Sequence, residues 1–97
     1  NGHGVDEVTI ENLDSHETRS LTCDGVFIFA GLVPKTEKVK GMIDLDSEGY
    51  VVADKTCHTS LPYVFAVGDI VRKPYRQITT AVADGTVAAI TATNELR

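Results

Sequence analysis

Gly68 and Asp69 directly follow the apolar run of residues 64–67, and a segment rich in Ala, Thr and Val comes after them. Ligands of α/β proteins bind beyond the carboxyl ends of the strands. Glycine lets another group approach the backbone closely, and a carboxylate accepts hydrogen bonds from sugar or polyol hydroxyls. A helix that begins after this pair directs its N–H groups and its positive end toward the same place. The arrangement indicates a ligand with hydroxyls and a phosphate or electron-rich carbonyl, although a Gly-Asp pair alone is more often a plain turn.

The remaining reactive side chains indicate neither a redox dithiol nor a metal site. Cys23 and Cys57 are not in a CxxC arrangement, and the three histidines lack ligand spacing to them. Two free thiols are favoured over a single disulfide between the two cysteines, which stays open as an alternative. Arg72, Lys73 and Arg76 are close in sequence, and ordinary surface charge is favoured over an anion site.

Composition excludes several classes of function. The chain has 97 residues, a net charge of −5 and a pI near 5.0, so the phosphate backbone of nucleic acid would be repelled. No apolar run approaches the roughly 18 residues of a membrane span, and the N-terminus has no secretory pattern. The apolar fraction of 42% suits one small globular domain. We expect no nucleic-acid partner, no membrane and a cytoplasmic location.

Four kinds of element must position these groups. Residues 1–23 predict a β-hairpin, with one strand over residues 5–13 and a polar tip over residues 13–20. Residues 26–33 are apolar on both faces, which is typical of a strand buried between layers. Short strands are expected at residues 50–53 and 64–67. A helix is expected from about residue 75 to 96, with Pro74 in its first turn.

Small residues form a stripe along the predicted helix, and the predicted buried strand needs cover on both faces. Ala81, Gly85, Ala88 or Ala89, and Ala92 recur every three or four positions, so they share one face. A close packing contact would explain the use of Gly85, which lowers helix propensity by about 1 kcal/mol. One helix cannot cover both faces of residues 26–33. We therefore expect the second layer to come from the rest of a larger protein, or else from a partner chain.

The residues around the Gly-Asp pair carry a family resemblance. Residues 59–69, TSLPYVFAVGD, resemble the C-terminal flavin motif of flavoproteins with two dinucleotide-binding domains. Tyr75, Arg76 and Gln77, followed by Gly85, narrow the resemblance to low-molecular-weight thioredoxin reductases and the flavoprotein of alkyl hydroperoxide reductase. Residues 24–34 resemble the segment that closes the NADPH domain and leads back to the FAD domain. The resemblance covers essentially the whole chain.

The resemblance implies an α/β fold, FAD as cofactor, and a role for each matching residue. Asp69 would accept a hydrogen bond from a ribityl hydroxyl, and Gly68 would let the polyol chain pass. Arg76 and Gln77 would lie against the isoalloxazine, and their N–H groups with that of Ile78 would face its pyrimidine-side carbonyl. Residues 1–36 would be the tail of the NADPH-binding domain, and residues 37–97 the C-terminal part of the FAD-binding domain. Lys35 and Asp84 depart from the family pattern.

The family's other motifs are absent from these 97 residues. There is no G-x-G-x-x-G for FAD or NADPH and no redox CxxC. The complete enzyme would pass a hydride from NADPH to FAD and then electrons to a thioredoxin-like disulfide. We expect no catalytic residue here, and a chain that is inactive without the missing N-terminal portion or a second copy. The alternative is a non-catalytic binding module that dimerises or pairs with a partner subunit.

Overall fold

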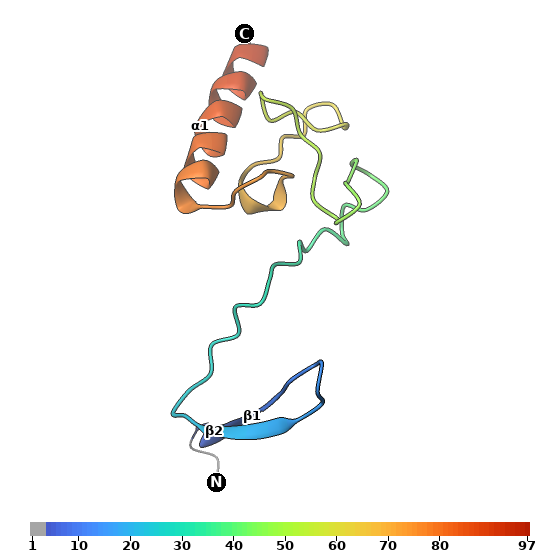
Figure 1. Cartoon of the computed structure of the whole chain (residues 1–97). Coiled ribbons are helices and arrows are strands. Elements are labelled where there is room, and N and C mark those ends of the chain that lie inside the picture. Colours follow the sequence, from blue (N-terminus) through green and yellow to red (C-terminus); the bar gives the residue numbers. More distant parts are fainter. Residues whose placement is uncertain (1–3) are drawn as a thin grey trace. The chain divides into compact units, whose positions relative to one another are not determined.

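The computed structural model describes residues 4–97, which divide into two compact units, residues up to 31 and residues 32–97. The units are described separately. The elements follow in the order β1 (Glu7–Glu11), β2 (Thr18–Thr22), the short 3₁₀ helix η1 (Gly68–Ile70) and α1 (Ile78–Glu95) (Figure 1). Within the described residues, no helix is long and apolar enough to cross a membrane.

The first unit is the predicted β-hairpin. β1 (Glu7–Glu11) pairs antiparallel with β2 (Thr18–Thr22), and Glu11 lies opposite Thr18. The connecting turn is closed by Asn12, whose side-chain oxygen accepts the backbone N–H groups of Asp14 at 2.9 Å and Ser15 at 3.1 Å. This closure makes the tip shorter than the predicted residues 13–20. Residues 1–3 of the predicted hairpin lie outside the described residues.

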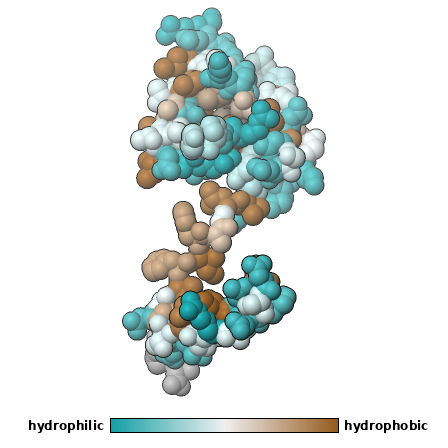
Figure 2. Space-filling model, viewed as in Figure 1, coloured by the Kyte–Doolittle hydropathy of each residue, from teal (hydrophilic) through white to brown (hydrophobic). Residues whose placement is uncertain are grey.

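The predicted buried strand over residues 26–33 is wrong for this chain. Phe27, Ile28 and Phe29 are 98%, 89% and 97% exposed, and no strand is assigned to this stretch. Figure 2 shows the brown, apolar side chains of this segment uncovered. A strand needs a neighbour to accept its backbone hydrogen bonds and layers to cover its side chains. The described residues supply neither, so no strand forms over this apolar stretch.

The second unit has a small core around Tyr50, Val51, Cys57 and Val71. Val51 lies at the centre of the backbone pairing in this unit. It forms an antiparallel bridge to Leu45 and a parallel bridge to Val71. The predicted strands at residues 50–53 and 64–67 are therefore reduced to isolated bridges: the two of Val51, and one between residues 58 and 65.

α1 (Ile78–Glu95) is the predicted helix, but it begins three residues later than expected. Gln77 is the N-cap with extended backbone, and Pro74 lies outside the helix. The Thr80 hydroxyl accepts the Gln77 N–H at 3.0 Å and donates to the Gln77 carbonyl at 2.8 Å. These local bonds fix the start of the helix at Ile78, so Pro74 precedes the helix instead of lying in its first turn.

The small-residue stripe faces the rest of the second unit, as its spacing predicts. Ala81, Gly85, Ala88 and Ala92 are all half-buried, whereas the opposite face of α1 is exposed. A Cβ added at Gly85 would meet nothing within 4 Å. The described residues therefore give no packing reason for a glycine here, and a close contact with another part of a larger protein stays a prediction.

Candidate functional site

The Gly-Asp pair begins η1 (Gly68–Ile70), a single 3₁₀ turn between the bridge region and α1. Gly68 has a φ of +78°, in the region that L-residues rarely adopt. Its carbonyl accepts the Val71 N–H at 3.1 Å, and its N–H donates to Asp84 Oδ2 at 2.9 Å. Both backbone groups of Gly68 are thus used inside the fold, so its contribution to a site is its conformation.

Asp69 is exposed on this turn, and Arg76 holds the backbone beneath it. Arg76 Nε donates to the Asp69 carbonyl at 3.0 Å, and one terminal nitrogen reaches the Val71 carbonyl at 3.5 Å. The guanidinium carbon lies 3.6 Å from the centre of the Tyr50 ring, a cation–π contact on a buried aromatic. The Arg76 side chain therefore stabilises the turn through backbone carbonyls and does not use the Asp69 carboxylate.

A cleft of about 220 Å³ opens beside these two residues within the second unit. Its lining combines apolar chain with one carboxylate and two cations: Leu32, Val33, Pro34, Lys35, Tyr50, Asp69, Ile70 and Arg76. The lining brings Lys35 to the same cleft as the Gly-Asp turn.

Gln77 and Ile78 follow Arg76 at the start of α1, and both are exposed. The Gln77 N–H is used by the Thr80 hydroxyl. Ile78 is the first helical residue, whose N–H has no acceptor in the helix itself. The structure therefore joins Arg76 to the Asp69 backbone on the turn that Gly68 begins, and places the helix N-terminus directly after Arg76 and Gln77.

Two residues at this site are not predicted from the sequence, Lys73 and Asp84. The sequence marks Asp84 only as a departure from the family, and Lys73 as surface charge. Asp84 Oδ2 accepts hydrogen bonds from both the Gly68 N–H and Lys73 Nζ, and the Lys73 side chain is only 11% exposed. The Lys73 ammonium, followed by the Gly68 N–H, holds the pKa of the Asp84 carboxyl below its usual range. The signal in the sequence that could have found Asp84 is helical spacing, because it lies three residues after Ala81 and so shares its helix face.

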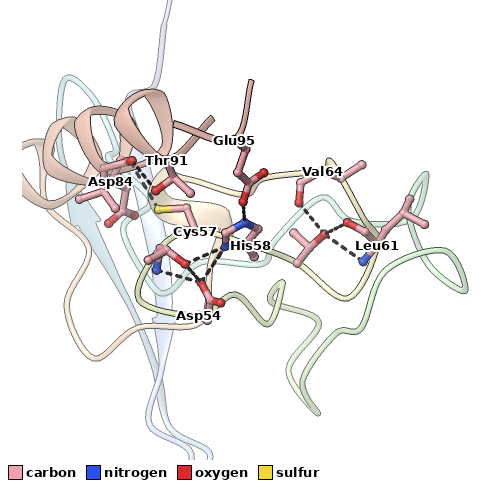
Figure 3. Close-up of polar contacts among 11 residues, drawn as sticks. Asp54, Cys57, His58, Leu61, Val64, Asp84, Thr91 and Glu95 are labelled. Carbon is pink, nitrogen blue, oxygen red and sulfur yellow. Dashed lines mark hydrogen bonds and ion pairs between the residues drawn. The ribbon is translucent and has the colours of Figure 1, made fainter. Parts of the chain in front are cut away.

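A second polar cluster joins the other end of α1 to the loop of residues 54–59 (Figure 3). His58 Nε2 contacts Glu95 Oε1, while its Nδ1 lies 2.7 Å from Thr56 Oγ1 and 3.6 Å from Asp54 Oδ1. The hydrogen bond to Glu95 raises the pKa of His58, and hydrogen bonds from Thr56 lower the pKa of Asp54. This cluster anchors the last turn of α1.

The two cysteines are free thiols, as favoured by the sequence. Cys57 is buried, with its sulfur 3.5 Å from the Asp84 carbonyl (Figure 3). Burial raises the pKa of the Cys57 thiol, so it is a poor nucleophile. No group of three or more potential metal ligands occurs in residues 4–97.

Comparison with known proteins identifies the class. The sequence model of the pyridine nucleotide-disulphide oxidoreductases matches residues 1–85. A 34.2 kDa protein of the rubredoxin operon of Clostridium pasteurianum is 42% identical over 88 residues, which are 91% of this chain and 29% of that protein. One component of the alkyl hydroperoxide reductase of Pseudomonas aeruginosa is 37% identical over 98% of this chain and 18% of its own length.

Solved structures agree with the sequence relatives. The thioredoxin reductase of T. acidophilum superposes with a TM-score of 0.80 at 35% identity, covering 95% of this chain and 31% of that one. The Lactococcus lactis thioredoxin reductase gives 0.79 at 38% identity, covering 92% and 29%. The chain thus spans less than a third of the length of these relatives.

The fold class is that of α/β flavoproteins with two dinucleotide-binding domains, as predicted. Within that class, the chain belongs to the pyridine nucleotide-disulphide oxidoreductase family.

Proposed function

We propose that this chain forms the ribityl and isoalloxazine side of the FAD site in an NADPH-dependent disulfide oxidoreductase of the thioredoxin reductase type. The observation that carries the proposal is the η1 turn: Gly68 has a φ of +78°, Asp69 beside it is exposed, and Arg76 Nε donates to the Asp69 carbonyl at 3.0 Å. An exposed carboxylate on a fixed turn is suited to accept a hydrogen bond from a polyol hydroxyl.

The start of α1 supplies the second half of the proposed site. The positive end of a helix stabilises negative charge that gathers on a bound group. Reduced flavin gathers such charge at its pyrimidine side, and the N–H of Ile78 at the first helical position is free of any intrahelical acceptor. In this proposal Arg76 and Gln77 lie against the isoalloxazine ring. Bound FAD would supply the redox chemistry, accepting a hydride from NADPH and passing electrons to the disulfide.

The relatives extend well beyond the stretch that this chain matches, and we assign the rest of the enzyme to that additional sequence. It would carry the pyrophosphate loops and the redox cysteines, so the 97 residues alone would be inactive. Residues 1–36 would complete the NADPH domain and residues 37–97 the FAD domain. Thioredoxin-like disulfides would be the acceptor. Two free thiols fit a cytoplasmic location, where thiols stay reduced.

The proposal can be tested in a chimera of known length. The matching segment of the T. acidophilum thioredoxin reductase is replaced by this chain, and bound FAD is measured from visible absorbance after desalting. We expect flavin near one per chain. Asp69→Ala removes a charged acceptor and should weaken FAD binding by roughly tenfold or more.

Glu48→Ala is the matched control, because Glu48 is an exposed carboxylate of the same unit away from the cleft. It should leave FAD binding unchanged. A folded chimera without flavin would overturn the proposal in favour of a non-catalytic binding module. Equal affinities of the Asp69→Ala and Glu48→Ala chimeras would remove the role assigned to Asp69.

A further inference from the structure

The η1 turn is attached to the middle of α1 at two points. The first is a hydrogen bond from the Gly68 N–H to Asp84 Oδ2 at 2.9 Å. The second is close approach rather than a bond, since the space beside Gly68 would place an added Cβ only 3.7 Å from the Cβ of Ala81. Ala81 and Asp84 are three residues apart and share one helix face. The conformation of Gly68 is therefore tied to a rigid helix rather than to the loop alone.

Lys73 completes this attachment from the loop that follows η1. Its ammonium contacts the same Oδ2 atom of Asp84 that accepts the Gly68 N–H. The Lys73 side chain is 11% exposed and that of Asp84 28% exposed, so the pair is shielded from water on most sides. A backbone N–H bonded to a carboxylate makes a stronger, charge-assisted hydrogen bond than one bonded to a neutral acceptor.

We propose that Asp84 is a positioning residue for the flavin site: by holding the Gly68 N–H, with Lys73 balancing its charge, it fixes the turn that presents Asp69 to the cofactor polyol. The inference rests on the proposed function for its ligand. Asp84 itself touches no ligand in this scheme and acts through Gly68.

The Gly68–Asp84 bond can be tested in the 97-residue chain without flavin. The Gly68 amide proton is followed by nuclear magnetic resonance as the pH falls through the range where carboxylates protonate. We expect it to shift with the titration of Asp84, below the ordinary range for aspartate, and to lose this titration in Asp84→Asn. Lys73→Met, which keeps the carboxylate, should move the midpoint to higher pH. A Gly68 signal unaffected by both variants would overturn the inference.

The consequence for the cofactor is tested in the chimera. Asp84→Asn keeps an acceptor but removes the charge, so FAD affinity should fall roughly fivefold to tenfold, whereas Glu48→Gln should have no effect. Flavin bound equally well by Asp84→Asn would refute the positioning role. A chimera that binds no flavin at all would instead refute the proposed function, and the Gly68 titration would still decide whether Asp84 holds the turn.

Discussion

Replacing Gly68 by Ala tests whether the η1 turn needs the backbone freedom of glycine. An L-residue in the left-handed region costs about 1–2 kcal/mol, and Gly68 has a φ of +78°. The new Cβ would lie 3.7 Å from the Cβ of Ala81, which is ordinary contact, so no clash adds to this cost. We therefore expect Gly68→Ala to lower the free energy of unfolding by about 1–2 kcal/mol.

The assay is urea unfolding of the chain, followed by far-ultraviolet circular dichroism of the helix. Gly85→Ala is the matched control, because Gly85 lies inside α1 and an added Cβ meets nothing within 4 Å. It should raise stability by about 0.5–1 kcal/mol through helix propensity. The slope with urea should stay constant in both variants. If Gly68→Ala were neutral or stabilising, the strain argument would be refuted.

Three further outcomes follow from the contacts of the second unit. The pKa of His58 is raised in the folded chain. The stability that protonated His58 contributes is therefore complete below about pH 6.5, the unfolded pKa, and is lost as the pH rises through the folded pKa. Amide exchange in the last turn of α1 should accelerate over that rise, and His58→Gln should remove the pH dependence. Thr36→Val should cost about 1 kcal/mol, measured by urea unfolding, because buried Thr36 Oγ1 donates to the Gly49 carbonyl at 2.7 Å; an unchanged midpoint would contradict this. Iodoacetamide should label Cys23 before Cys57, which is 6% exposed with a raised pKa, as mass spectrometry of timed digests would show; equal rates would argue against burial.

The features that local sequence determines were predictable. The hairpin of β1 and β2 follows from strand alternation and a polar turn, and the helix with its small-residue face follows from spacing of three and four. The Gly-Asp pair is recognisable as a turn before a helix because both signals lie within a few residues. The predicted helix start is wrong, since Pro74 is a common first-turn residue but the Gln77–Thr80 bonds decide the boundary.

The features that depend on distant residues were not predictable. Residues 26–33 have the apolar pattern of a buried strand, but the described residues provide neither a neighbouring strand nor a covering layer. Asp84 looks unexplained in the sequence because its partners, Gly68 and Lys73, lie 16 and 11 residues away along the chain. Periodicity places Asp84 on the correct helix face, but only coordinates show which backbone group lies opposite it.

The uncovered segment also bears on how this chain behaves at high concentration. Residues 26–32, VFIFAGL, carry no charge and no proline, and Phe27–Phe29 are almost fully exposed. Stretches of six or seven residues with strong β propensity and no charge are the ones that stack into cross-β fibrils. Asp24 on one side, with Pro34 and Lys35 on the other, are the kinds of residue that interrupt such stacking. The exposed apolar segment therefore favours self-association of the chain at high concentration, and the flanking charged residues and Pro34 oppose it.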